Sequence, residues 1–166
     1  MKITMSHKQA ALKIKHWYLF QYRVIEAAVK GKEAFTLFDK MKPEKQDRIR
    51  QKLRLNPFEI PILMLTICAN QYIINTSERF VKITPTKHES VYYEEFDGFT
   101  SYESLHFAKK KPKSNKTAAL TELGLKKTTG EIVFWKIPSG NTCYFFWNIT
   151  RLVQQIRIIA DSNEHL

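Results

Sequence analysis

Apolar residues in the first part of the chain recur at steps of three and four, which is the spacing of a helix with one buried face. This pattern predicts one long helix over residues 6–30. Ser6 followed by Gln9 matches a capping box at its start, and Gly31 is a typical residue just after a helix end. The apolar stripe comprises Ala10, Ile14, Trp17, Tyr18, Val24, Ile25 and Ala28.

Two shorter segments continue the helical spacing. Residues 32–41 carry Phe35, Phe38 and Met41 and are predicted to form a second helix. Residues 44–54 are predicted to form a third, strongly charged helix that begins just after a proline and ends before Asn56-Pro57, because the residue before a proline avoids helical geometry.

From residue 57 onward the apolar pattern changes to short runs rich in β-branched and aromatic residues, which is typical of strands. We expect six or seven strands, the clearest of which lie at residues 60–67, 72–74, 80–83, 91–96, 118–125 and 131–137. A final helix is predicted near the C-terminus, where Leu152, Val153, Ile156 and Ile159 would share one face.

Three helices followed by a series of strands and one helix indicate an α+β fold with an antiparallel sheet. We therefore predict a helical region over residues 1–56 and a β-rich domain over residues 57–166. A content of 11 Phe, 7 Tyr and 3 Trp is enough to build a hydrophobic core, so we expect a folded rather than a disordered chain.

Residues 60–160 resemble bacterial domains related to the pleckstrin-homology and GRAM superfamily. The matching stretches are 60–83, with Tyr72, Asn75, Thr76 and Arg79, then 90–99, with Tyr93, Glu94, Glu95 and Phe96, then 130–138 and the closing helix at 147–156. The resemblance implies an antiparallel, partly open β-barrel closed by a C-terminal helix. It implies a binding module and brings no set of catalytic residues.

Positive charge is concentrated in the predicted helices. Residues 1–56 contain 14 Lys and Arg against 5 Asp and Glu, a balance of +9, whereas residues 57–166 have a balance of only +2. An acidic partner is therefore expected to bind the N-terminal part.

Two clusters of cations are the candidate binding sites. The first, which we call the basic helix, packs seven cations into fifteen residues: Lys40, Lys42, Lys45, Arg48, Arg50, Lys52 and Arg54. The second, the basic loop, contains Lys109, Lys110, Lys111, Lys113 and Lys116. Each is a candidate for binding phosphate or an acidic protein, and the alternative for each is a solvated surface without a partner.

Catalytic and metal-binding patterns are absent from the sequence. Glu94, Glu95 and Asp97 are the carboxylates that we consider for metal-dependent hydrolysis. Adjacent strand residues point to opposite faces, so of these three only Glu95 and Asp97 could share a face. No lysine follows them at the spacing of a metal-dependent nuclease. The five histidines lack ligand spacing, and Cys68 and Cys143 are expected to be buried, reduced thiols. We expect no catalytic residues, no metal and no cofactor.

The sequence thus favours a non-enzymatic binding protein that recognises an acidic protein, such as an adaptor or a toxin-neutralising immunity protein. A nucleic-acid-binding accessory or regulatory protein is the second hypothesis, and a peripheral binder of anionic membranes is the third. Lys8, Lys13 and Lys15 interrupt any apolar stretch of signal-peptide type, so we expect a soluble, cytoplasmic protein.

Overall fold

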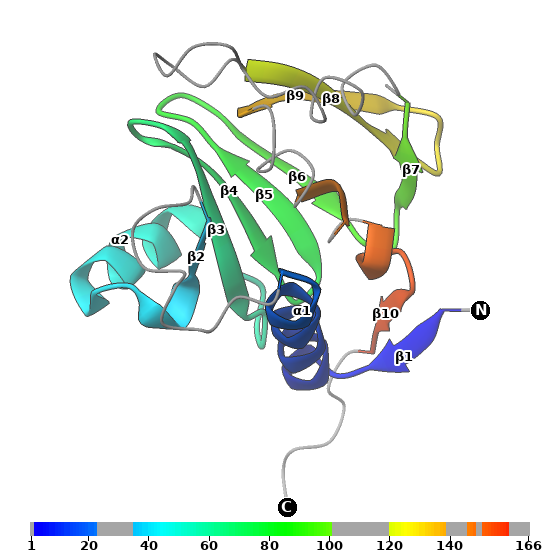
Figure 1. Cartoon of the computed structure of the whole chain (residues 1–166), viewed down its shortest axis with the longest axis horizontal. Helices are drawn as coiled ribbons and strands as arrows, with labels where there is room; N and C mark the ends of the chain where they lie inside the picture. The colour runs from blue at the N-terminus through cyan, green and yellow to red at the C-terminus, as the bar shows by residue number, and fades with distance from the viewer. Residues whose placement is uncertain (1, 23–34, 101–119, 139–145, 149–150, 160–166) are drawn as a thin grey trace, which may run out of the picture. The chain divides into compact units, whose positions relative to one another are not determined.

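The computed structural model describes residues 2–22, 35–100, 120–138, 146–148 and 151–159. The chain forms two compact units, residues 1–94 with 155–166 and residues 95–154, and each is described by itself. Both helices and sheets are present, so the protein has a mixed α+β fold (Figure 1). The basic segment at residues 1–56 lies entirely within the first unit.

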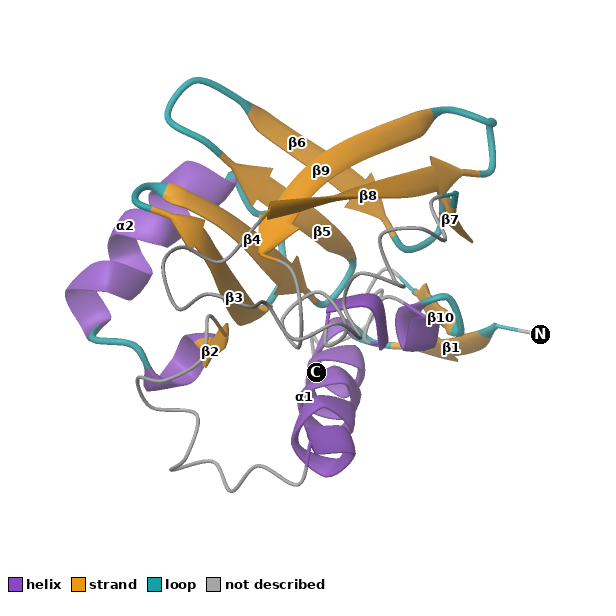
Figure 2. Cartoon of the chain, turned by 45° about the horizontal axis from the view of Figure 1, so that its top comes forward, coloured by secondary structure: helices purple, strands orange, loops and turns teal. Residues whose placement is uncertain are grey.

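The first unit is built on a five-stranded antiparallel sheet of order β2-β3-β4-β5-β6 (Figures 1 and 2). Its strands are β2 (Phe35–Leu37), β3 (Pro61–Cys68), β4 (Gln71–Thr76), β5 (Arg79–Ile83) and β6 (His88–Tyr92). Sequential neighbours pair through short turns, and the predicted strands at 60–67, 72–74 and 80–83 are confirmed. The predicted strand at 91–96 was wrong, because residues 93–95 form a turn that ends β6.

One face of this sheet is covered by α2 (Pro43–Leu53). Met64, Ile74 and Val81 lie side by side across β3, β4 and β5, so their side chains point to the same face. They form a buried core with Ile83 of β5, with Ile49 and Leu53 of α2, and with Phe38 and Met41 from the segment before α2. Burial of eight apolar side chains at about 1.5–3 kcal/mol each is the main force that holds α2 on the sheet.

The other face of the sheet is contacted by α1 (His7–Tyr22). The ring of Tyr18 lies 5.7 Å from that of Phe35. Phe35 pairs with Leu65, the neighbour of Met64, and therefore points away from α2. The capping box at the start of α1 is confirmed, because Ser6 N–H donates to Gln9 Oε1 at 3.0 Å and Gln9 N–H donates to Ser6 Oγ at 3.3 Å.

The prediction of a helix over residues 32–41 was wrong within the described residues. Residues 35–37 form the edge strand β2 and are followed by a single 3-10 turn, η1 (Phe38–Lys40). Phe35 and Leu37 are both buried because pairing with β3 points alternate side chains into the core. Long-range pairing has therefore overridden the helical spacing of Phe35, Phe38 and Met41.

The C-terminal prediction was also wrong in part. Residues 151–153 are helical, but Ile156–Ile158 form β10, which pairs in parallel with β1 (Ile3–Met5). Ile156 is fully buried in this arrangement, whereas Ile159 is exposed, so the two do not share a buried helix face. Parallel pairing of the two chain ends cannot be read from local periodicity.

The second unit contains a three-stranded antiparallel sheet of order β7-β8-β9. Its strands are β7 (Phe96–Phe99), β8 (Leu120–Lys127) and β9 (Ile132–Pro138), and residues 146–148 and 151–153 are helical. Leu123, Leu125, Trp135, Ile137, Phe146 and Val153 are buried. The predicted strands at 118–125 and 131–137 are thus confirmed where the structure describes them.

The described strands form three separate sheets of two, five and three strands, not the expected partly open barrel. In the first unit, helices pack on both faces of the sheet, which favours an open layered arrangement over closure of the sheet on itself. No helix in the described ranges is long and apolar enough to cross a membrane.

Candidate functional site

A pocket of about 310 Å³ opens beside α2 in the first unit. Four exposed cations line it, namely Lys42, Lys45, Arg48 and Lys52, together with one carboxylate, Glu44. All four cations belong to the basic helix that the sequence analysis singled out. The pocket therefore carries a local excess of positive charge, which attracts an anionic partner.

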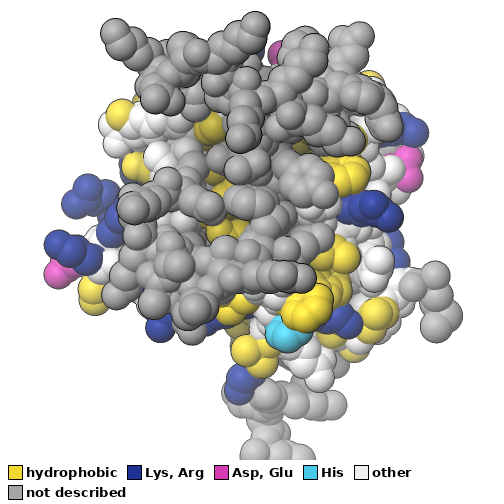
Figure 3. Space-filling model, in the orientation of Figure 1, with side chains coloured by type: hydrophobic (Ala, Val, Ile, Leu, Met, Phe, Trp, Pro, Cys, Tyr) yellow, Lys and Arg dark blue, Asp and Glu magenta, His cyan; other side chains and the backbone are white. Residues whose placement is uncertain are grey.

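The seven cations of the basic helix are divided by the structure: Lys40 and Lys42 precede α2, Arg54 follows it, and only some of the seven line the pocket. Lys45, Arg48 and Lys52 are three and four positions apart, so they share the pocket side. Lys40, Arg50 and Arg54 are exposed and do not line this pocket. Lys and Arg side chains project where α2 lies, at the left edge of Figure 3. The structure thus divides a cluster that appears continuous in the sequence.

The floor of the pocket comes from residues that the sequence analysis did not assign to a site. Tyr72 of β4 and Ile83 of β5 are paired across the sheet, and Ile49 of α2 packs in the same buried core. Asn70, in the turn between β3 and β4, completes the lining in a left-handed conformation (φ +62°). No local signal marks these residues, because only strand pairing and helix packing bring them together.

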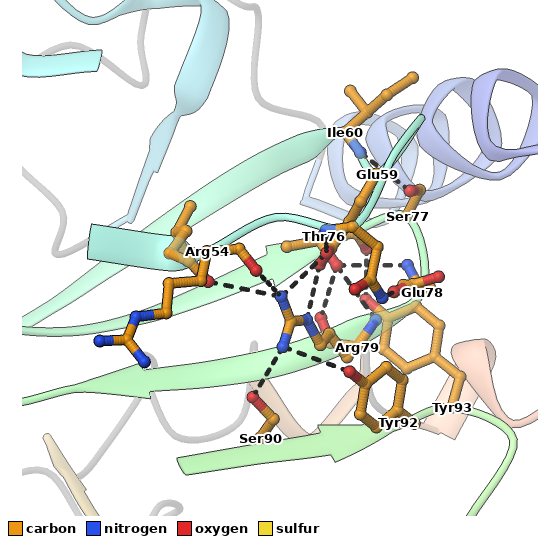
Figure 4. A network of polar contacts seen from close by, with 12 residues as sticks. Arg54, Glu59, Ile60, Thr76, Ser77, Glu78, Arg79, Ser90, Tyr92 and Tyr93 are labelled. Carbon is orange, nitrogen blue, oxygen red and sulfur yellow. Dashed lines mark hydrogen bonds and ion pairs between the residues drawn. The ribbon is translucent and has the colours of Figure 1, made fainter. Parts of the chain in front are cut away.

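A buried ion pair fastens the end of α2 to the sheet (Figure 4). Arg79, the first residue of β5, donates from Nε to Glu59 Oε1 at 2.8 Å and from Nη2 to Glu59 Oε2 at 2.9 Å. The same Nη2 lies 3.4 Å from the Leu53 carbonyl oxygen and 3.1 Å from that of Arg54. The guanidinium thus donates to carbonyl oxygens that would otherwise be unpaired at the end of α2, and its positive charge complements the helix dipole.

The remaining donors of Arg79 are also used. Its Nη1 donates to Ser90 Oγ at 3.2 Å and to Tyr92 Oη at 3.4 Å (Figure 4). Burial opposes the charge of this guanidinium, but the hydrogen bond to Glu59 and the negative charge of Glu59 outweigh it, so the pKa of Arg79 is raised above its ordinary value. Arg79 is therefore a positioning residue, with no donor left over for a ligand.

Tyr93 lies in the same network and is fully buried. Its hydroxyl donates to the Thr76 carbonyl oxygen at 2.5 Å. Burial raises the pKa of Tyr93 well above its usual value, and the charges of Glu59 and Glu78 raise it further, against a smaller opposite effect of the Asn75 side chain. Tyr93 is thus a neutral hydrogen-bond donor at physiological pH.

A test of this assignment is the alkaline stability of a Tyr93→Phe variant. A pKa that is raised on folding contributes stability that is fully present below about pH 10, the unfolded tyrosine value, and is lost as pH rises above it. Between about pH 10 and 11, we expect the free energy of unfolding of wild type to fall by up to about 1.4 kcal/mol more per pH unit than that of the variant. Urea unfolding at a series of pH values measures this, and equal slopes would contradict the assignment.

His7, Ser77 and Glu78 are arranged in the order of a hydrolytic triad. Nδ1 of His7 lies 2.7 Å from Ser77 Oγ, and its Nε2 lies 3.6 Å from Glu78 Oε2. However, Ser77 is 0% exposed, and its hydroxyl already accepts the Ile60 N–H at 3.0 Å. A nucleophile must reach its substrate, so we interpret this group as a structural tie between α1 and the sheet.

The segment 94–97, considered for metal-dependent hydrolysis, has lysine neighbours that the sequence spacing did not reveal. In the second unit, Lys127 of β8 lies 3.5 Å from Glu95 and 3.1 Å from Glu131, and Lys126 lies 3.1 Å from Asp97. The hydrogen bond to Glu131 contributes most to raising the pKa of Lys127. Within the described ranges, no three His, Cys, Asp or Glu side chains gather into a metal site.

Two further sequence predictions can be placed. Cys68 is exposed, contrary to the prediction, because β3 has a bulge between Thr66 and Cys68 and the strand ends there. Cys143 and the whole basic loop, Lys109, Lys110, Lys111, Lys113 and Lys116, lie outside the described residues.

Comparison of the chain with models of known protein families, with curated proteins and with solved structures found no match. The interpretation of the pocket therefore depends on its own geometry and charge.

Proposed function

We propose that this chain is a non-catalytic binding protein that recognises an acidic protein through the pocket side of α2, as an adaptor or an immunity-type protein would. One observation carries the proposal: four cations follow one edge of a pocket whose floor is apolar. Acidic side chains of a partner match the rim, and its apolar side chains match the floor. Protein interfaces combine an apolar centre with a polar margin in this way.

Nucleic acid remains the second candidate partner, because Lys45, Arg48 and Lys52 form a row of cations along one helix. Phosphate backbones are bound mainly by such charges, and that binding depends steeply on salt. The apolar floor favours the protein partner, since a row of phosphates gains little from contact with the exposed part of the Tyr72 ring.

Capture of partners from a native lysate with tagged protein tests this function. We expect a discrete acidic protein to be retained after nuclease treatment, with only moderate loss between about 50 mM and 200 mM salt. Binding through six or more phosphates would instead fall by about 10³-fold or more over that salt range. Loss of all captured protein after nuclease would overturn the proposal in favour of nucleic acid.

A further inference from the structure

We infer that the partner's segment inserts one large apolar side chain into the α2 pocket and places carboxylates on both sides of it. This inference rests on the proposed function and specifies what the pocket recognises. The ligand class is a short acidic peptide with a central aromatic or branched aliphatic anchor.

The volume of the pocket supports an anchor of this size. Sites for whole small molecules and cofactors measure about 300–1,000 Å³, so a pocket of about 310 Å³ lies at the lower end of that range. It has room for one large side chain and the backbone next to it.

The chemistry of the floor supports an apolar anchor. Ile49 is 3% and Ile83 is 1% exposed, and both belong to the core between α2 and the sheet. Tyr72 packs against the same core and is only half-buried, so part of its ring remains available for contact. Because Ile49 and Ile83 are already buried, the exposed part of the Tyr72 ring is the surface against which an apolar anchor would pack, and such buried anchors supply most of the affinity of an interface.

The cations at the rim of the pocket favour acidic residues on either side of the anchor in the bound peptide. Lys42, Lys45, Arg48 and Lys52 follow one another along α2 and the residue before it, so a row of cations extends along the α2 edge of the opening. Glu44 is the one carboxylate among the residues that line the pocket. Carboxylates on both sides of the anchor are attracted by this rim, whereas basic flanks are repelled.

The rigidity of the site adds to the argument. The Arg79 guanidinium bonds the carbonyls at the C-terminal end of α2, and the buried core holds the length of the helix, so α2 and the sheet keep their arrangement before a ligand arrives. A partner then does not have to order the site on binding, which preserves affinity.

Fluorescence anisotropy with labelled synthetic peptides tests the inference on the full chain. Four peptides share three acidic residues on each side of a central Phe, Leu, Trp or Ser, and a fifth has the central Phe with Gln in place of the acidic residues. We expect the Phe, Leu and Trp peptides to bind at least about tenfold more tightly than the Ser peptide, as burial of one such side chain allows. We expect the Gln peptide to bind weakly.

Protein variants locate the binding. Arg48→Glu is expected to weaken every acidic peptide by about tenfold or more, because it reverses one charge of the rim. Tyr72→Ala is expected to remove the preference for the apolar peptides, and Tyr72→Phe to retain it. The comparison among peptides on wild-type protein does not depend on how well these variants fold.

The outcomes separate the inference from the proposed function. If all four acidic peptides bind equally and their binding still depends on Arg48, the inferred apolar anchor is wrong, whereas the proposed recognition of an acidic protein is retained. Three results would overturn both the anchor and the proposed function. No peptide binds, or peptide binding is unchanged by Arg48→Glu, or a single-stranded oligonucleotide binds more tightly than every peptide.

Discussion

Replacing Arg79 with Met is expected to lower the free energy of unfolding of the first unit by about 3–5 kcal/mol, the cost of removing one partner from a buried ion pair. Glu59 has 0% side-chain exposure and would keep its carboxylate without its two charge-assisted hydrogen bonds. The Leu53 and Arg54 carbonyls at the end of α2 would also lose their donor. Urea or thermal unfolding followed by circular dichroism measures the loss.

Two control variants show whether the cause is the unpaired carboxylate. Arg48→Met removes an exposed cation from the same region and is expected to change stability by no more than about 0.5 kcal/mol. The double variant Arg79→Met with Glu59→Gln is expected to recover part of the loss, because no unpaired charge remains buried. A loss below about 1 kcal/mol for Arg79→Met would contradict the central role that we give to this pair.

Reversing the charges on the pocket side of α2 is expected to abolish partner binding. The variant Lys45→Glu, Arg48→Glu, Lys52→Glu places three carboxylates at the rim, and like charges across an interface cost several kcal/mol. We expect at least about a 100-fold loss of captured partner. Quantitative mass spectrometry of lysate captures provides the measurement.

The matched control is the variant Lys40→Glu, Arg50→Glu, Arg54→Glu. It changes the net charge of the chain by the same amount at exposed positions that do not line the pocket. Arg50 lies over the ring of Phe38 with 5.2 Å between its guanidinium carbon and the ring centroid, so a modest loss of stability is expected as well. Partner binding within a few-fold of wild type would assign recognition to the pocket side. Equal loss in both triple variants would show that overall charge, not the pocket, attracts the partner.

The sequence alone could not predict how the candidate site is assembled. Residues 44–54 were predicted to be helical and basic, and α2 and its cations confirm this. The division of the cations into those that line the pocket and those that do not follows from the packing of Ile49 and Leu53 on the sheet. The floor needs Tyr72 and Ile83 to pair across two strands, and a pairing register between strands is not encoded in either strand by itself.

Arg79 illustrates the same point for stability. The sequence shows an isolated cation at the start of an apolar run, between Glu78 and Phe80. Its partner Glu59 is twenty residues away, and the carbonyls that it caps belong to a helix end more than twenty residues away. Only the folded chain brings these groups within 3.4 Å of the Arg79 guanidinium nitrogens.

The sequence by itself determined the features that depend on neighbouring residues. These are the helical spacing of α1 and α2, the capping box of Ser6 and Gln9, the strand runs within residues 60–83 and 120–137, and the concentration of charge in residues 1–56. Tertiary structure decided the features that depend on contacts between distant segments. It made Phe35–Leu37 and Ile156–Ile158 strands, left the described strands as three separate sheets and placed an apolar floor beneath the basic helix. The physical reason is that backbone pairing and burial free energy are gained only when distant segments meet, and together they outweigh the weaker local preferences of a few residues.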